Sequence, residues 1–320
     1  MQQTSGNPVR RQNSMTNYPA HNDRFRKSLV YRVGGSVGFF GEYINMLLAI
    51  LYCLDNGIRF TIYSGDANFG CRNGWTDYFE AFCAESRRAY HAKQNLRYIG
   101  KTFFLKCYDL VRPVLNLPYL TQDLWPSIRL LEDKIYDIPE VGISGCTLRE
   151  ALAHVSRHVW RYNPETMEEV SRLTASVPID GRFVGFHIRR GDKYQEYPLF
   201  PLDLYIRRAE ELTGIRNAFV LTDDYRVIRL LRDKYPSWTF STLCDPDEEG
   251  YFHDDFVKLS RQTIRNNLVK LFASVELLSH SEYFVGTLSA SPGCYLGLRM
   301  DPARCRYLDF NEWGRWWLCR

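Results

Sequence analysis

The sequence lacks the signatures of several large protein classes. Its longest apolar run, 46–54, is far shorter than the roughly 18 residues that a membrane-spanning helix needs. The nine cysteines form no Cys-x-x-Cys pair and no cluster with zinc spacing. Because the count is odd and the chain is long, no disulfide framework is required. Buried free thiols and a bond between Cys71 and Cys83 are the two alternatives.

Motifs of common nucleotide-binding and hydrolytic enzymes are missing as well. Gly34-Gly35-x-x-Gly38 departs from the Gly-x-Gly-x-x-Gly spacing of dinucleotide-binding turns, and no acidic residue ends the next strand at Tyr63. There is no P-loop lysine pattern and no Gly-x-Ser-x-Gly motif. The net charge of +4, from 41 basic and 37 acidic residues, is too small to indicate a nucleic-acid partner.

What is present is the composition of a globular protein. Hydrophobic residues make up 45% and charged residues 24% of 320 positions, enough for one large domain or two ordinary ones. The polar first 27 residues predict a disordered tail over 1–27. Because the sequence shows no leader peptide, no membrane span and no Asn-x-Ser/Thr site, the expected location is the cytoplasm. The alternative is the Golgi lumen, if the chain is the trimmed domain of an anchored enzyme.

The first half of the chain begins with a predicted strand–helix–strand unit. A buried strand over 29–33, a glycine-rich turn, a helix over 42–55 and a second strand over 59–63 follow one another. The stretch 98–136 has no clean period and is interpreted as mixed and mostly helical. Two helices are then expected over 147–162 and 164–176. The turn-rich segment 177–181 predicts a boundary between an acceptor-side domain, 28–178, and a donor-binding domain, 179–320.

The second half alternates strongly between strand and helix. This pattern predicts a mostly parallel, doubly wound sheet, and the fold class is therefore α/β with two Rossmann-like domains. The expected strands are 183–188, 218–221, 238–241 and 283–285, and the expected helices are 201–212, 225–235 and 264–279, with a last helix after 287.

The segment 187–193, His-Ile-Arg-Arg-Gly-Asp-Lys, lies just after a predicted buried strand. Ligands bind at the carboxyl edge of open α/β sheets, and guanidinium groups match phosphate oxygens. Arg189 and Arg190 can reach one ligand only if the chain turns here, which Gly191 allows. The alternative is a surface loop in which Asp192 neutralises one arginine.

Three further groups of polar residues are candidates for the same edge. Glu196 lies three residues after Lys193, and the two would serve as a general base and a cation that stabilises phosphate, or they are two solvated charges. Thr222-Asp223-Asp224 and the Thr287, Ser289 and Ser291 set each end a strand and precede a helix. They can bind hydroxyls or phosphate, or simply cap helices. Adjacent rather than alternating aspartates make a metal site a weak interpretation.

These segments together resemble a known family. The 187–193 segment is similar to the His-Val-Arg-Arg-Thr-Asp-Lys segment of α1,6-fucosyltransferases. Thr222-Asp223-Asp224 resembles that family's Thr-Asp-Asp strand end, and 278–289 resembles its Leu-Ser…Phe-Leu-Val-Cys-Thr-Phe-Ser run. The glycine turn before 41 and the Gly-Trp loop at 74–79 also resemble segments of the family.

The resemblance implies an inverting fucosyltransferase of the GT-B type, independent of metal and cofactor. GDP-fucose would be the donor, bound in the C-terminal domain, and a glycan hydroxyl would be the acceptor. No nucleic-acid partner and no membrane span are expected. By the same resemblance, Lys193 and Glu196 form the catalytic pair together with Arg189. The implied donor-binding set is His187, Arg189, Arg190, Asp192, Tyr205, Asp223, Asp224, Ser289 and Ser291.

Three positions depart from the family's pattern. Gly191 replaces a threonine, Glu196 is one residue closer to the lysine, and Ser274 stands where the family has a donor-binding aspartate. Two alternatives therefore stay beside the fucosyltransferase hypothesis. One is a related transferase that uses another nucleotide sugar, and the other is a catalytically silent nucleotide- or carbohydrate-binding protein on the same fold.

Overall fold

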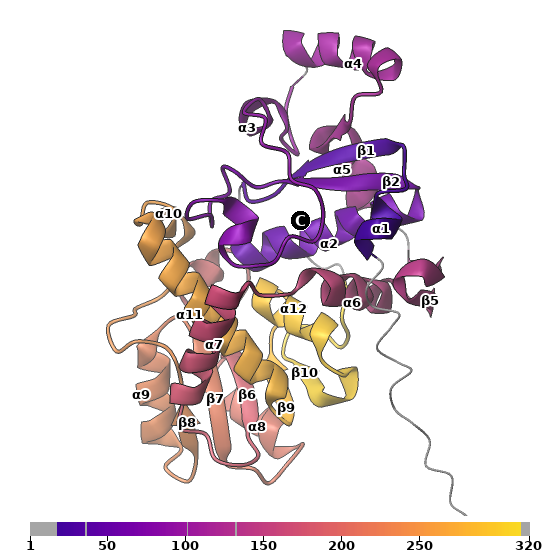
Figure 1. The fold of residues 1–320 in the computed structure, drawn as a ribbon. Helices are drawn as coiled ribbons and strands as arrows, with labels where there is room; N and C mark the ends of the chain where they lie inside the picture. Colours follow the sequence, from indigo (N-terminus) through magenta and orange to yellow (C-terminus); the bar gives the residue numbers. More distant parts are fainter. Residues whose placement is uncertain (1–17, 36, 101, 132, 315–320) are drawn as a thin grey trace, which may run out of the picture. The chain divides into compact units, whose positions relative to one another are not determined.

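The computed structural model describes residues 18–35, 37–100, 102–131 and 133–314 (Figure 1). By the packing of its backbone the chain divides into two compact units. The first takes its described residues from Met1–Val33, Asn45–Tyr63 and Glu80–Arg161, and the second consists of Gly34–Ile44, Ser64–Phe79 and Tyr162–Arg320. Three segments that were expected in the first domain, 34–44, 64–79 and 162–178, thus belong to the second unit.

The first unit is built on a small parallel sheet. β1 (Lys27–Arg32) pairs in parallel with β2 (Ile58–Tyr63) and with the short β3 (Tyr119–Leu120). The connection from β1 to β2 contains α2 (Phe39–Asp55), so the predicted strand–helix–strand unit is confirmed. Side chains from both long strands are buried, which follows from their apolar sequences.

A short helix corrects the prediction of a disordered tail over 1–27. Residues 18–22 form α1 (Tyr18–Asn22), in which Tyr18, His21 and Asn22 are buried. The Asn22 side chain accepts a hydrogen bond from the Phe60 amide at 2.7 Å and donates to the Phe60 carbonyl at 3.0 Å. One polar side chain therefore satisfies two backbone groups of β2, and composition gave no sign of this. The rest of the predicted tail lies outside the described residues.

The remainder of the first unit is mostly helical, as predicted for 98–136, but it also contains a hairpin. The antiparallel strands of that hairpin were not predicted. Thr147 begins the last helix of the unit with a capping box, because its Oγ1 accepts from the Glu150 amide and the Glu150 carboxylate accepts from the Thr147 amide. The elements are α3 (His91–Gln94), α4 (Phe103–Leu115), α5 (Thr121–Arg129), β4 (Tyr136–Ile138), β5 (Ile143–Cys146) and α6 (Leu148–Val159).

The second unit contains a five-stranded sheet in the order β10-β9-β6-β7-β8, and every pairing is parallel. This confirms the predicted α/β class. The short edge strand β10 was not predicted. The strands are β6 (Val184–Ile188), β7 (Asn217–Thr222), β8 (Thr239–Ser241), β9 (Tyr283–Gly286) and β10 (Cys305–Tyr307), and the helices are α7 (Pro164–Ser176), α8 (Leu202–Glu210), α9 (Tyr225–Lys234), α10 (His253–Phe256), α11 (Arg261–His280) and α12 (Ser291–Arg299).

Helices cover both faces of this sheet. Val184, Phe186 and Ile188 point to one face and share a buried core with residues of α8 and α9. On the opposite face, a Cβ at Gly185 would stand 2.8 Å from a methyl group of Leu278 in α11. α11 in turn packs along α7, as Figure 1 shows. Alternate residues of β6 therefore face different helices, as a doubly wound sheet requires.

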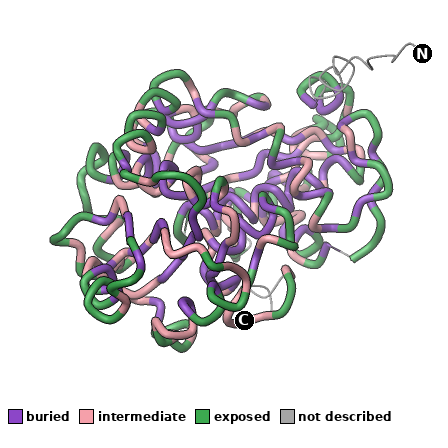
Figure 2. Tube along the Cα trace, turned by 90° about the horizontal axis from the view of Figure 1, so that it is seen from below, coloured by how far each residue is buried: buried purple, intermediate pink, exposed green. Residues whose placement is uncertain are grey.

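The strands of the larger sheet consist mostly of buried residues. Figure 2 shows how buried and exposed residues are distributed along the chain. No helix among the described residues is both long and apolar enough to cross a membrane. The eight cysteines in this part of the chain are all free, including Cys71 and Cys83, so the disulfide alternative is not realised there. Cys319 lies outside the described residues.

Candidate functional site

The order of strands in the second unit marks where a ligand would bind. From β6 the chain proceeds to β7 and β8 on one side, and β9 then pairs with the other side of β6. Such a reversal of strand order opens a crevice at the carboxyl ends of the two strands. The loops after β6 and β9, 189–196 and 287–290, flank this point, and the loop after β7 begins at Asp223.

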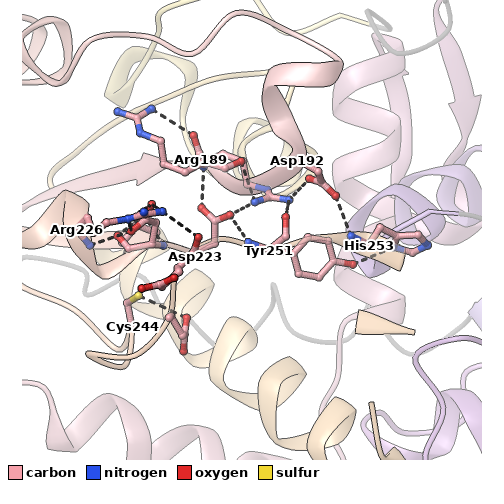
Figure 3. A network of polar contacts seen from close by, with 12 residues as sticks. Arg189, Asp192, Asp223, Arg226, Cys244, Tyr251 and His253 are labelled. Atoms are coloured by element: carbon pink, nitrogen blue, oxygen red, sulfur yellow. Dashed lines mark hydrogen bonds and ion pairs between the residues drawn. The ribbon is translucent and has the colours of Figure 1, made fainter. Parts of the chain in front are cut away.

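Arg189 is held inside the protein by four hydrogen bonds (Figure 3). Its Nη1 donates to the Asp223 carboxylate and to the Arg190 carbonyl. Its Nη2 donates to Asp192 Oδ1 at 2.6 Å and to the Tyr251 carbonyl at 3.1 Å. The guanidinium carbon also lies 4.8 Å from the centre of the Tyr251 ring, a cation–π contact. All four Nη hydrogens are thereby used, although the side chain retains 17% exposure.

A loop that the sequence analysis did not single out completes this arrangement. The Tyr251 amide donates to Asp223 Oδ2 at 2.8 Å, and the His253 amide donates to Asp192 Oδ2 at 2.8 Å. The Asp192 amide donates back to the Tyr251 carbonyl at 3.0 Å. The two aspartates therefore tie the arginine loop to 251–253 (Figure 3). Nothing in the polar stretch 244–255 distinguished Tyr251 and His253 in advance.

The close contact between these loops explains the departure at Gly191. Its φ is +50°, and an added Cβ would stand 2.2 Å from the Tyr251 carbonyl oxygen and 2.5 Å from the Tyr251 nitrogen. A threonine cannot fit in this space without displacing the loop. In the facing loop, Gly250 has φ +118°, and a Cβ added there would lie 2.8 Å from the Gly191 Cα. The two glycines permit the backbones to approach each other.

Arg190 differs from Arg189 in having no carboxylate partner. Its Nη1 and Nη2 donate to the carbonyls of Arg189 and Phe200, each at 3.3 Å, and its amide donates to Asp223 Oδ1 at 2.7 Å. No ion pair involves Arg190 within the described ranges. Burial lowers the pKa of its guanidinium, which nevertheless stays charged. Arg190 therefore brings a half-buried positive charge with N–H groups to spare.

The neighbouring Asp224 is occupied by a capping role. Asp224 is the N-cap of α9, and its carboxylate accepts a hydrogen bond from the Arg226 amide at 2.9 Å. The same carboxylate forms an ion pair with the Arg226 side chain at 2.7 Å. Burial raises the pKa of Asp224, but the hydrogen bonds from Arg226 outweigh it and hold the pKa below its usual value. The capping alternative is confirmed for this aspartate. Its predicted contact with the donor stays a prediction.

Lys193 and Glu196 are in direct contact. Lys193 Nζ donates to Glu196 Oε2 at 2.7 Å and to the Ser289 carbonyl at 2.6 Å. The lysine is buried, with 7% exposure, whereas the Glu196 side chain is 58% exposed. The pair is therefore not two solvated charges. A buried cation fixes an accessible carboxylate beside the loop that follows β9.

A second residue missed by the sequence analysis, Asp309, organises that loop. Its two carboxylate oxygens accept from the Leu288 amide at 2.9 Å and from the Ser289 amide at 2.7 Å. These are backbone donors of the kind that the sequence analysis assigned to a phosphate. Ser291 is the first residue of α12. The predicted donor contacts of Ser289 and Ser291 would come from their hydroxyls or from other amides, and they stay predictions.

We expect the substitution Asp309→Ala to weaken both stability and catalysis. Two amides lose a charged acceptor, which costs about 2 kcal/mol in the free energy of unfolding. Since the Ser289 carbonyl holds Lys193, turnover should also fall, by roughly tenfold. Urea denaturation and turnover measurements test this, with Asp203→Ala as a control, because Asp203 is 45% exposed and bonds Lys234 and Tyr235 rather than the loops of the site. An unchanged turnover number in Asp309→Ala would contradict the expectation.

Two predicted donor-binding residues are almost completely buried. His187 has 3% exposure and lies against Gly286 and Gly293. Its burial, and to a smaller extent the positive charge of Arg189, lowers the pKa of its ring to about 3. The ring is therefore neutral. Tyr205 has 2% exposure and packs edge-on against Phe186 in the core. Their burial favours a supporting role over contact with the donor, and the predicted contacts stay predictions.

Comparison with known proteins now adds to this geometry. Residues 151–302 match the family model of the α-(1,6)-fucosyltransferase N- and catalytic domains. This match supports an α1,6-fucosyltransferase-like family for these residues. The match includes the arginine loop and the loops after β7 and β9, and it ends before Asp309. A comparison with curated protein sequences gave no match.

Solved fucosyltransferase structures have a similar fold. A structure of NodZ from Bradyrhizobium has a TM-score of 0.55 at 15% identity, covering 90% of this chain and 96% of that one. NodZ α1,6-fucosyltransferase soaked with GDP-fucose has a TM-score of 0.53 at 15% identity, covering 89% and 95%. A GDP complex of an Arabidopsis thaliana FUT1 mutant has a TM-score of 0.53 at 12% identity, covering 90% and 71%. These likenesses show the fold.

The family-model match supports the predicted enzyme class, a glycosyltransferase. It supports fucosyl transfer as the general activity. The fold of the family, α/β with parallel sheets, agrees with the sheets of both units. Within the described residues no group of three or more His, Cys, Asp or Glu side chains has the arrangement of a metal site.

Proposed function

We propose that the protein transfers fucose from GDP-fucose to a glycan hydroxyl, with inversion at the anomeric carbon. The observation that carries the proposal is Arg190, a cation without a carboxylate partner at the reversal of strand order, in a fucosyltransferase-like chain. Its unused N–H groups suit the diphosphate of a nucleotide sugar. The family supplies the general activity, and the roles of single residues below are inferences.

Arg190 would stabilise the departing diphosphate. As the bond between the anomeric carbon and the β-phosphate oxygen breaks, negative charge grows on that oxygen, and a fixed guanidinium lowers the barrier. Arg189 adds positive charge close by and keeps Asp192 and Asp223 in place. Its direct contact with phosphate would require one of its four hydrogen bonds to be exchanged, so we assign the first contact to Arg190.

Glu196 would act as the base. Its exposed carboxylate takes the proton of the acceptor hydroxyl while the oxygen attacks the face of the sugar opposite the leaving group. Lys193 holds the carboxylate by the 2.7 Å hydrogen bond. Because Glu196 and Arg190 follow the same strand, β6, one short loop carries both functions. The arrangement suits a one-step displacement.

One observation favours a different donor. Ser274, which stands where the family has an aspartate, is 3% exposed, and its Oγ donates to the Lys270 carbonyl of its own helix at 2.9 Å. It offers no carboxylate and little surface to a donor. A related transferase that uses another nucleotide sugar is therefore the second candidate.

A panel of nucleotide sugars separates the candidates. We expect GDP-fucose to raise the melting temperature more than GDP-mannose, UDP-sugars or TDP-sugars, since a ligand of the native state stabilises it according to its affinity. Release of the matching nucleoside diphosphate (GDP, UDP or TDP) should then be measured with the same panel. A clear shift and turnover with a UDP- or TDP-sugar alone would replace GDP-fucose as the donor. Binding without turnover on any acceptor would favour the silent binding protein.

A further inference from the structure

Three aromatic residues lie in or just after the segment that carries Lys193 and Glu196, and the ring of a fourth, Phe310, lies 6.0 Å from one of them. We call them the aromatic strip: Tyr194, Tyr197, Phe200 and Phe310. Tyr194 is 61% exposed, and the other three are partly exposed. All four belong to the second unit, and none has a part in the chemistry proposed above. What distinguishes Tyr194 from other exposed aromatic residues is its place between Lys193 and Glu196.

Three of the four rings pack together, and Tyr194 belongs to the same loop. The Tyr197 ring lies 6.1 Å from the Phe200 ring at an interplanar angle of 28°, and 6.0 Å from the Phe310 ring at 51°. The backbone fixes it to the catalytic loop, because the amides of Glu196 and Tyr197 both donate to the Lys193 carbonyl, at 3.0 and 2.9 Å. These bonds fix Tyr197 to the turn that also carries Glu196.

The chemistry of the strip suits a sugar. The apolar C–H face of a sugar ring packs on an aromatic ring, while its hydroxyls need hydrogen-bonding groups at the edge. Such groups are present, since Gln195 Nε2 lies 3.5 Å from the Tyr194 hydroxyl and Glu196 is adjacent. The neighbouring cation, Lys193, is buried and paired. The other cation near the strip, Arg190, is half-buried, and its Nη2 donates to the Phe200 carbonyl at 3.3 Å.

We propose that the aromatic strip binds neutral sugar rings of the glycan acceptor and presents its hydroxyl to Glu196. This rests on the proposed function, since it makes the strip the acceptor side of the same site. It assigns binding of a neutral oligosaccharide to the segment 194–200 and to Phe310. The donor side, at Arg190, is left unchanged.

The test compares binding, transfer and donor hydrolysis in Tyr194→Ala. Binding of a chitooligosaccharide and of an N-glycan core is followed by saturation-transfer NMR without donor. We expect about tenfold weaker binding and an equal loss in kcat/KM for the acceptor, the size of one aromatic contact. Hydrolysis of GDP-fucose, in which water replaces the glycan, should change less than twofold. Tyr194→Phe should retain most of the binding, and Leu230→Ala, a 57% exposed apolar residue of α9, should retain all of it.

The other possible results of this experiment contradict either the acceptor surface or the proposed function. Failure of the unsubstituted protein to bind either oligosaccharide, or equal binding by Tyr194→Ala, overturns the proposal. So does an equal fall in hydrolysis and transfer, which would assign the strip to the donor, and so does a dimer that dissociates in Tyr194→Ala, which would assign it to a second copy. Glycan binding through the strip without hydrolysis of any nucleotide sugar would instead contradict the proposed function and still support the strip as a glycan-binding surface.

Discussion

Replacing Arg190 by alanine is expected to reduce kcat/KM for the donor by about 10²–10³-fold, the loss seen when one fixed donor to a developing negative charge is removed. The reason is that Arg190 carries positive charge without a carboxylate partner at the end of β6. The fold should be retained, because its side chain gives up only two hydrogen bonds, each 3.3 Å long. Turnover and thermal unfolding measured on the same sample check this.

Two matched variants sharpen the result. Arg190→Lys keeps the charge but loses the planar fork, so we expect an intermediate loss of about tenfold. Arg182 precedes the same strand at its other end, is 72% exposed and pairs with Glu282, so Arg182→Ala should leave turnover unchanged. Full activity in Arg190→Ala would contradict the proposed contact with the diphosphate.

Arg189→Ala provides a contrast within the same loop. Its removal leaves Asp192 and Asp223 without their shared cation, and a partly buried carboxylate that loses its partner costs several kcal/mol. Activity should therefore be lost together with stability, whereas Arg190→Ala loses activity alone. Equal stability of the two variants would argue against this division of roles between the adjacent arginines.

The sequence sufficed for the strands and helices around the site, and for the residues next to β6. Apolar runs end at Ile188 and at Thr222, and polar residues follow at once, so the edge of the sheet could be predicted from local pattern. Contacts between distant segments could not. The His253 amide, at the start of the four-residue helix α10, bonds Asp192 across 61 residues. Asp309, two residues after the short edge strand β10, bonds the Ser289 amide across 20 residues. Such short elements have no periodic signal in the sequence.

The assignment of segments to the two units was also beyond local pattern. α2 is one continuous helix, yet its residues up to Ile44 belong to the second unit and those from Asn45 onwards to the first. Hydrophobic spacing identifies a helix and its buried faces, and it carries no information about which core each turn enters. The same is true of the glycines that follow β1, Gly34, Gly35 and Gly38. They come directly after a strand of the first unit in sequence but belong to the second unit.

Gly191→Ala is expected to be the most damaging small substitution in the site. At φ +50° the alanine would sit in a left-handed conformation that costs roughly 1–2 kcal/mol, and its Cβ would collide with the Tyr251 backbone at 2.2 Å. Backbone atoms cannot give way as a flexible side chain can, so we expect a total loss of about 3 kcal/mol in the free energy of unfolding. Separation of the loops would also release Arg189 and Asp223, and turnover should fall more than 100-fold.

Gly181→Ala separates strain from collision. Gly181 has a similar φ of +69°, but an added Cβ there meets nothing within 4 Å. This variant should lose only the conformational term, about 1 kcal/mol, and keep full activity. The difference between the two alanines in urea denaturation then measures the contact between 191 and 251 itself. If Gly191→Ala unfolded at the same urea concentration as Gly181→Ala and remained active, the two loops would not be clamped together, and Arg189 would be free to turn towards the diphosphate.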